Sequence, residues 1–307
     1  MSESHQSNDD LQLLFQELRK KTKIVIVAGA GISEAAGIPE FRTRLNAAEG
    51  KDNLERCKYI TKDMLDAFAF SDDQKTKQFM VMTRELSQTF SSARPTAFHH
   101  FIAHLAKRGQ IRRLYIQNID DIDIKIHPLA TEVPLSLKGP WPNTIQLHGS
   151  LSKVCCSKCS HIDDFRQTDF QGHQMPSCNQ CQAYSEARSS RGMRSLSIGK
   201  LRPRISLYSE QPWDADAVGR VSVADVRASP DAVVVVGTAL KVHGTAKLVQ
   251  ELCRATHSRR QGICIWLNID CPPTGSNMKK CWDFVVLSRC DTFARLYGIK
   301  EEPVITF

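Results

Sequence analysis

Residues 24–33, with the sequence IVIVAGAGIS, decide the fold. The first five are apolar and mostly β-branched, which predicts a buried strand. Gly29 and Gly31 follow directly, and glycines after a first strand let the backbone approach a bound phosphate beside the N–H groups of the next helix. The pattern is weak evidence alone, because a tight turn without a ligand also explains it. Glu34 stands where a dehydrogenase fingerprint has its third glycine, so hydride transfer is not predicted.

Two later apolar runs, residues 233–236 (VVVV) and 263–267 (ICIWL), have the same buried-strand character. Such strands, separated by helical stretches, favour a parallel sheet that is covered by helices on both faces. The sequence therefore predicts an α/β fold. Residues 11–20 predict a helix with basic residues at its end. Residues 47–110 are expected to be mostly helical, with a break at Arg94-Pro95.

The composition is that of a globular protein with a substantial core: 307 residues, 41% apolar and 24% charged. No apolar run approaches the ~20 residues that span a bilayer. The N-terminal residues MSESHQSNDD are polar and acidic, which does not suit a secretory signal. We therefore expect the chain to reside in a reducing compartment. There its 11 cysteines would bind metal or pack in the core more often than form disulfides. The net charge of +8 suits a nucleic-acid-rich environment or an ordinary solvated surface.

Four cysteines form two CxxC pairs about twenty residues apart, a spacing typical of a closed tetrahedral zinc site. They are Cys156, Cys159, Cys178 and Cys181. A closed site has no coordination position for water, so we predict one structural zinc ion. Cys155 is left out, because its CxxC partner position is Lys158. Residues 155–182 are polar and rich in Gln, Ser and Cys, which predicts a small zinc module inserted into a larger domain of residues 1–154 and 183–307.

Small or polar residues follow three of the predicted strands, where ligands bind in open α/β sheets. They are Gln117-Asn118-Ile119-Asp120, Gly237-Thr238 and Asn268-Ile269-Asp270. Each could be an ordinary loop by itself, but three such strand ends together favour a binding site.

These motifs together resemble the sirtuin family of NAD-dependent protein deacylases. The matching segments are AGAGISEAAGIPEFR (28–42), QNID (117–120), His148-Gly149, the four cysteines, LRPRISLYSE (201–210), GTALKV (237–242), Asn268 and Cys290-Asp291. They fall in the family's order over roughly residues 24–295. Residues 124–143 and 191–203 look closest to a fungal branch of histone-deacetylating sirtuins. The resemblance implies an inverted Rossmann-like sheet domain with a zinc-binding module and a helical module inserted.

The implied activity is that of an NAD-dependent protein lysine deacetylase that acts on histones and releases nicotinamide and O-acetyl-ADP-ribose. The implied catalytic residues are His148, Asn118 and Asp120, with His148 as general base, for which an imidazole pKa of about 6.5 is suitable. The implied cofactor-binding residues are Ala28, Gly29, Ala30, Gly31, Ser33, Phe41, Arg42, Gln117, Asn118, Ile119, Asp120, Gly237, Thr238, Ala239, Asn268, Ile269, Asp270 and Cys290. Ser206, Leu207 and Tyr208 would pair with the substrate peptide as with an added β-strand.

The resemblance also implies an acetylated histone or another protein as partner, and no membrane. Direct nucleic-acid binding is not expected, because the zinc module has few arginines and lacks the CxxC…HxxxH spacing of a DNA-reading finger. We expect a nuclear protein. The sequence shows no strong nuclear import run, so a cytoplasmic location stays open.

The sequence departs from the family pattern at Glu40 (usually Asp), Ile116 (Thr), Ser209 (Gly) and Ala239 (Ser), and in residues 121–125. Ser209 matters most, because a side chain costs roughly 1 kcal/mol or more where glycine is required for a positive φ. An alternative is therefore a pseudoenzyme that binds NAD as a sensor or scaffold for acylated proteins. The intact His148 argues against that alternative.

Overall fold

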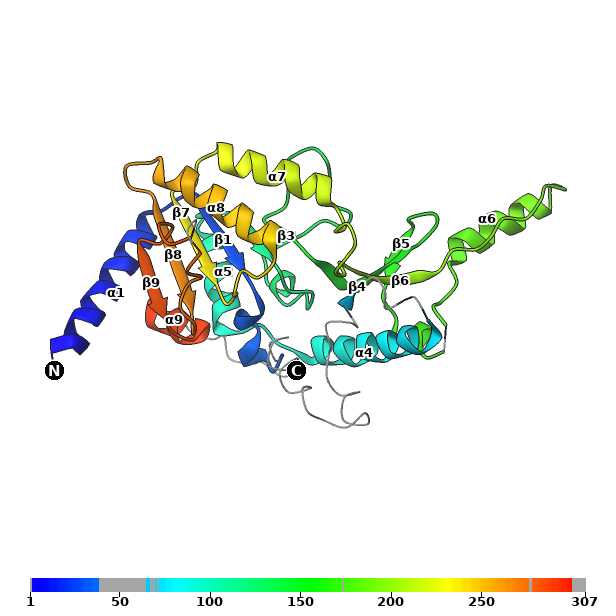
Figure 1. Ribbon diagram of the computed structural model, residues 1–307, viewed down its shortest axis with the longest axis horizontal. Coiled ribbons are helices and arrows are strands. Elements are labelled where there is room, and N and C mark those ends of the chain that lie inside the picture. The colour runs from blue at the N-terminus through cyan, green and yellow to red at the C-terminus, as the bar shows by residue number, and fades with distance from the viewer. Residues whose placement is uncertain are drawn as a thin grey trace.

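The computed structural model describes residues 2–38, 65–66, 70, 72–172, 174–275 and 278–299. Within these residues the chain forms a six-stranded sheet and a separate three-stranded sheet (Figure 1). The predicted cofactor residues Phe41 and Arg42, the departure at Glu40 and part of the predicted helical stretch 47–110 lie outside the described residues. No helix among the described residues combines the length and apolar character needed to cross a membrane.

The large sheet is parallel throughout, with the strand order β3-β2-β1-β7-β8-β9. Its strands are β1 (Ile24–Ala28), β2 (Ile111–Ile116), β3 (Thr144–Gln146), β7 (Ala232–Val236), β8 (Ile263–Asn268) and β9 (Phe284–Leu287). All three predicted apolar runs are strands, and every residue of β1, β7 and β8 is buried. The sheet grows outward in both directions from the pair β1 and β7, which is the topological switch point of a doubly wound fold. The predicted parallel α/β fold is confirmed.

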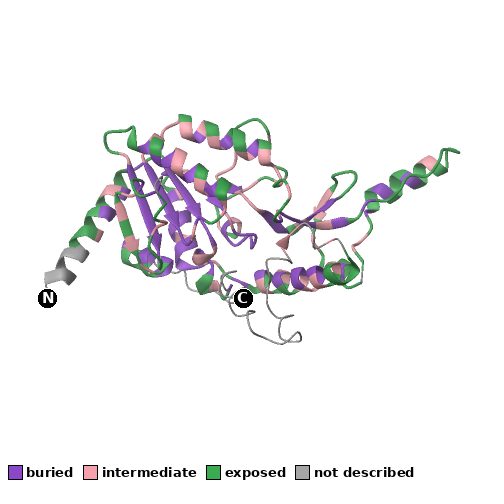
Figure 2. Ribbon diagram, in the orientation of Figure 1, coloured by how far each residue is buried: buried purple, intermediate pink, exposed green. Residues whose placement is uncertain are grey.

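Helices cover both faces of the large sheet (Figure 1). They are α1 (Ser2–Lys20), α5 (Ala97–Lys107) and α9 (Cys290–Tyr297) on one face, and α7 (Ala215–Arg227) and α8 (His243–His257) on the other. Because successive side chains of a strand point to opposite faces, Ile24 and Ile26 join the first core cluster, while Val25 and Val27 join the second. Figure 2 shows the buried sheet between half-exposed helices.

Capping residues set the ends of the helices around the predicted break. Helix α4 (Asp73–Ser92) begins after Asp72, whose side chain accepts a hydrogen bond from the Lys75 N–H. Helix α5 begins after Thr96, which forms a capping box with His99. The predicted interruption at Arg94-Pro95 is therefore confirmed. The short 3₁₀ helices are η1 (Ala30–Ile32), η2 (Glu34–Ala36), η5 (Asp123–Lys125) and η6 (Gln167–Phe170).

The four-cysteine unit is larger than the predicted 155–182. It contains the three-stranded sheet with order β5-β4-β6, made of β4 (Gly149–Cys156), β5 (Ile162–Asp164) and β6 (Leu201–Ile205). Helix α6 (Asn179–Ser189) runs past the predicted boundary and projects away from the body (Figure 1). The boundaries need correction because β6 pairs antiparallel with β4, so the three-stranded sheet of the unit extends to Ile205.

Candidate active site and metal centre

A cavity of about 430 Å³ lies where the C-terminal ends of β1, β2, β7 and β8 meet the residues that follow β6. It is lined by Gly29, Ala30, Leu65, Gln117, Asn118, Ile119, His148, Ile205, Ser206, Leu207, Tyr208, Ser209, Glu210, Pro212, Gly237, Thr238, Ala239, Lys241, Val242, Asn268 and Asp270. The three strand ends singled out in the sequence thus meet around one cavity. We call the cavity residues at and just after the C-terminal ends of β1, β2, β7 and β8 the strand-end wall, and residues 205–210 with Leu65 the loop wall.

Hydrogen bonds centred on Thr238 tie the strand-end wall together. Gln117 Nε2 donates to Thr238 Oγ1 at 2.9 Å, and the N–H of Leu240 donates to the same hydroxyl at 3.1 Å. Asn268 Nδ2 donates to the carbonyl oxygen of Thr238 at 3.0 Å. The ends of β2, β7 and β8 are therefore fixed relative to one another by side chains that the sequence had placed at a binding site.

Gly31 and Gly237 are required by the contact between the loops that follow β1 and β7. A Cβ on Gly31 would lie 2.7 Å from the Cα of Gly237, and Gly237 itself has a φ of +57°. The Gly31 N–H donates to the Gly237 carbonyl at 2.9 Å. Close packing at the switch point thus demands these glycines.

Behind the strand-end wall, Asn118 and Asp120 form a buried network with Ser33. Ser33 Oγ donates to Asp120 Oδ2 at 2.8 Å and accepts from Asn118 Nδ2 at 3.0 Å. Burial raises the pKa of Asp120, against the opposing effect of hydrogen bonds from the Ile122 N–H and Ser33. Only Asn118 of these three lines the cavity, so Ser33 and Asp120 hold its amide in place from behind.

Asp123 is a further carboxyl group near this network. It is completely buried and lies close to Asp120 and Asp121. Burial raises its pKa to about 8, and the charges of Asp120 and Asp121 act in the same direction. Asp123 was not predicted as a functional residue. The available signal was the sequence DDID at 120–123, three acids in a run of four residues soon after the end of β2.

His148 lies on the cavity with its ring oriented by the end of β2. Its Nδ1 is 2.8 Å from the carbonyl oxygen of Gln117. Because a carbonyl only accepts, Nδ1 carries the proton and Nε2 is left with its lone pair. Burial lowers the pKa of His148, partly offset by the hydrogen bond to Gln117. The next residue must be glycine, since Gly149 has a φ of +76° and a Cβ there would lie 2.1 Å from the Arg204 carbonyl oxygen.

In the loop wall, the backbone N–H groups of residues 206–208 are already used within the chain. The N–H of Ser206 donates to the His148 carbonyl, that of Leu207 to Glu210 Oε1, and that of Tyr208 to the Leu65 carbonyl, at 2.7–2.9 Å. Asp66 and Tyr208 form an isolated parallel β-bridge. The expectation of a free strand edge at residues 206–208 therefore needs correction, because a second segment of the chain already pairs beside Tyr208.

Ile205, Glu210 and Leu65 line the loop wall and were not predicted as site residues, and one further residue, Ser209, is strained. Glu210 accepts two hydrogen bonds from Arg202 at 2.7 Å and one from Leu207, which fixes the turn, and Leu65 comes from a distant part of the chain. Ser209 has a φ of +64°, the conformation in which a glycine is favoured, and its Oγ donates to Asp66 Oδ2 at 2.8 Å.

Some predicted cofactor residues do not line the cavity. They are Ala28, Gly31, Ser33, Asp120, Ile269 and Cys290. Ala28 is the buried last residue of β1, and Ile269 is exposed. Cys290 begins α9 and packs in the core cluster of Phe293 and Tyr297, as expected for a small core residue.

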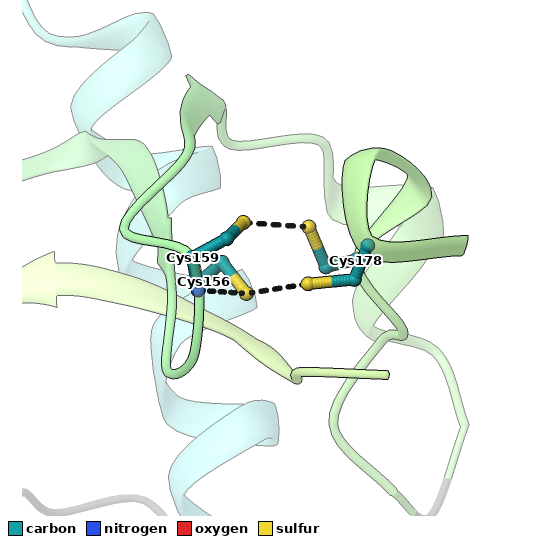
Figure 3. Close-up of side chains that lie close together, drawn as sticks. Cys156, Cys159 and Cys178 are labelled. Carbon is teal, nitrogen blue, oxygen red and sulfur yellow. Dashed lines mark hydrogen bonds between the residues drawn. The ribbon is translucent and has the colours of Figure 1, made fainter. Parts of the chain in front are cut away.

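The four predicted metal ligands gather in the small unit. Figure 3 shows sulfur atoms that point toward one another from the β4–β5 turn and from the start of α6. The Sγ atoms of Cys156 and Cys181, and those of Cys159 and Cys178, are each 3.7 Å apart, and all four lie within 4.8 Å of one another. Ligands at ~2.3 Å from a tetrahedral zinc would be ~3.8 Å apart, so the four thiols fit zinc. Cys155 is not part of the group, as predicted.

The fold and the site define a doubly wound sheet of the nucleotide-binding type, joined to a four-cysteine unit. Residues 29–244 match the Sir2 family, and the chain belongs to this family. The NAD-dependent protein deacetylase hst4 of Emericella nidulans is 43% identical over 95% of this chain and 49% of its own length. The NAD-dependent protein deacetylase hst4 of Schizosaccharomyces pombe is 38% identical over 91% of this chain and 66% of its own length. The chain thus spans between half and two-thirds of these two relatives.

A third relative, the NAD-dependent histone deacetylase HST4 of Saccharomyces cerevisiae, is 33% identical over 94% of this chain and 79% of its own length. Among solved structures, a Sir2 homolog–NAD complex superposes with a TM-score of 0.67 at 22% identity, covering 93% of this chain and 92% of that chain. At this identity the likeness shows the fold, and it agrees with the Rossmann-like sheet and attached small unit.

Proposed function

We propose that this chain is an NAD-dependent protein lysine deacetylase that acts on acetylated histones and releases nicotinamide and O-acetyl-ADP-ribose. One observation carries the proposal. His148, with a proton fixed on Nδ1 and a free Nε2, lies on a cavity between a strand-end wall suited to a nucleotide and a loop wall suited to a peptide.

The strand-end wall supports NAD as the cofactor. The cavity lies at the switch point, where doubly wound sheets bind nucleotides, and its volume of about 430 Å³ falls in the range of small-molecule sites. Gly29, Gly237 and Thr238 would hold the phosphates and ribose, Asn268 the adenosine ribose, and Asn118 the nicotinamide amide. Lys241 adds a positive charge at the rim. When bound, NAD would supply the ribose carbon that accepts the acyl group as nicotinamide leaves.

His148 is suited to act as a general base. Its lowered pKa keeps the imidazole neutral at pH 7, and the carbonyl of Gln117 fixes the tautomer in which Nε2 accepts a proton. Asn118 would orient the bound amide, because Ser33 and Asp120 hold its side chain from behind.

The loop wall supports a protein substrate. Ile205, Leu207 and Leu65 line this side of the cavity and would surround the aliphatic stem of an acyl-lysine. Since the N–H groups of residues 206–208 are taken, peptide pairing here would rely on carbonyl acceptors or on release of the Leu65 contact. Histones as substrates are supported by the relative named a histone deacetylase, and a nuclear location follows from that substrate.

The four cysteines would hold one structural zinc ion. Backbone N–H groups of Lys158 and Cys159 donate to Cys156 Sγ, as expected where a thiolate is stabilised in a zinc knuckle. The ion would orient β4, which begins next to His148, and β6, which leads into the loop wall. It would take no part in the chemistry.

The test is incubation of the full chain with NAD and acetylated histone peptides, with product analysis for nicotinamide and O-acetyl-ADP-ribose. An unacetylated peptide and a reaction without NAD are the controls. Nicotinamide release that depends on acetylation supports the proposal. NAD binding without release would favour the sensor or scaffold alternative, which the strained Ser209 supports. Release only with acetylated non-histone peptides would keep the deacetylase and remove the histone assignment.

A further inference from the structure

A second group of metal-ligating side chains lies at the end of the large sheet opposite the cavity. It joins the last residue of α8 (His257), the second residue of β8 (Cys264) and Asp283, which directly precedes β9. Cys264 is four residues before Asn268 on the same strand, about 13 Å from the strand-end wall. The function proposed above uses none of these residues.

The three ligand atoms already converge. A ring nitrogen of His257, Sγ of Cys264 and a carboxylate oxygen of Asp283 all lie within 4.8 Å of one another. His257 Nε2 is 2.9 Å from Asp283 Oδ2. The histidine and the carboxylate are partly exposed, which leaves a route for an ion, while the thiol is fully buried.

The backbone holds two of these ligands in fixed register. The N–H of Cys264 donates to Asp283 Oδ2 at 2.7 Å, and the N–H of Asp283 donates to the Cys264 carbonyl at 2.9 Å. Hydrogen bonds of this kind to a ligating carboxylate orient it and raise metal affinity. The arrangement therefore resembles an ordered ligand set more than a chance surface contact.

Further thiols border the same three residues. Cys253 lies one helical turn before His257 on α8, and its carbonyl oxygen accepts a hydrogen bond from the Cys264 thiol at 3.9 Å. Cys253, Cys264 and Cys281 are all buried and free of disulfides. A set of sulfur, imidazole and carboxylate donors binds zinc in preference to magnesium or calcium.

We propose that His257, Cys264 and Asp283 form a second zinc-class site with three protein ligands, whose fourth position water would fill. Zn²⁺ would bind Nε2 of a neutral His257 imidazole that carries its single proton on Nδ1, and the thiol proton of Cys264 would go to solvent. Tetrahedral ligands lie ~3.2–3.8 Å apart, between the observed 2.9 Å contact and the 4.8 Å limit of the group, so small side-chain shifts suffice. The partly exposed ligands make this ion more exchangeable than the one held by the four cysteines.

The test is titration of the full chain with Zn²⁺ in competition with a chelator, repeated with Co²⁺ to detect thiolate-to-metal charge transfer. The wild-type chain should bind a second ion after the four-cysteine site is full. His257→Ala and Cys264→Ala should each weaken that second ion at least ~100-fold, beyond the loss typical of outer-shell changes. Cys271→Ser, a change at an exposed cysteine outside the group, is the matched control and should keep both ions.

Because Cys264 is buried in the core, its variant could fail to fold, and Asp283→Asn serves as a second variant. The asparagine still accepts from the Cys264 N–H but is a much poorer zinc ligand, so it should also weaken the second ion. A wild-type chain that binds one zinc ion only would overturn the proposal. So would a second ion that His257→Ala and Asp283→Asn both retain with unchanged affinity.

Discussion

The two walls of the cavity are built on opposite principles. The strand-end wall consists of residues at the ends of adjacent parallel strands, joined by Gln117, Thr238 and Asn268. The loop wall consists of an irregular segment after β6, held by Glu210, by a contact with Leu65 and by a serine in a left-handed conformation. The first wall inherits its geometry from the sheet, and the second depends on a few separate contacts.

This difference indicates where variation is tolerated. A change in the strand-end wall must fit the contact between Gly31 and Gly237, so the backbone there allows almost no side chain. A change in the loop wall disturbs single hydrogen bonds, and the departure at Ser209 falls on that side. We therefore expect cofactor binding to be robust and peptide handling to be adjustable.

The largest effect is expected from a substitution that disrupts the loop wall and leaves the strand-end wall intact. Cys178→Ser should release zinc and unfold the small unit, because ligand binding and local folding are one process at such sites. β6 leads directly into the loop wall, so peptide turnover should be lost while NAD binding remains measurable. Metal analysis and NAD binding by calorimetry check this. Cys155→Ser is the control, and this variant should retain the zinc ion of the four-cysteine site. A full zinc complement in the Cys178 variant would contradict the ligand assignment.

The next effect concerns the residue between the two walls. His148→Ala should leave NAD binding largely intact and reduce turnover by ~10²–10⁴-fold, the usual loss for a general base. Since the pKa of His148 is lowered from its ordinary value of 6.5, wild-type activity should fall only as the pH drops below that value. Steady-state rates across pH measure both features. Deacetylation by the variant at the wild-type rate would rule out this role.

A smaller effect tests the acids behind the strand-end wall. Burial raises the pKa of Asp123 from 3.8 to about 8, so the folded state holds a proton that the unfolded state loses between these values. Asp123 therefore makes the wild-type chain less stable as pH rises through this window, by at most about 1.4 kcal/mol per pH unit.

Asp123→Asn removes this titration, so its stability relative to wild type should increase from pH 5 to pH 8. Urea unfolding at the two pH values measures the difference. Asp10→Asn, at an exposed position of α1, is the control and should follow the wild-type pH dependence. Equal pH dependence of the Asp123 variant and wild type would mean that Asp123 is charged in the folded protein.

Local pattern was sufficient for the strand-end wall and insufficient for the loop wall. The apolar runs, the polar residues at the strand ends and the four cysteines are short-range signals, and each gathers where its spacing predicts. The Leu65–Tyr208 contact joins residues far apart in sequence, and the full burial of Asp123 depends on how neighbouring elements pack. The extent of the small unit was underestimated for the same reason, because β6 returns to pair with β4 only after the long α6 excursion. Such non-local pairings leave no periodicity in the sequence.

The smallest expected effect addresses Ser209 directly. Any side chain at its φ of +64° costs about 1 kcal/mol of stability relative to glycine. The hydroxyl of Ser209 offsets this with a hydrogen bond to Asp66 that contributes roughly 0.5–1.5 kcal/mol. Ser209→Gly removes both, so stability should change by less than about 1 kcal/mol and peptide kcat/KM should rise modestly as the loop wall relaxes. Ser209→Ala removes the hydrogen bond but keeps the strain, so it should be less stable than the glycine variant by about 1 kcal/mol. Urea unfolding and peptide kinetics of the two variants separate the backbone from the hydroxyl. Equal stability of the alanine and glycine variants would show that the left-handed backbone is not strained, and a fall in kcat/KM for glycine would make the hydroxyl a positive contact.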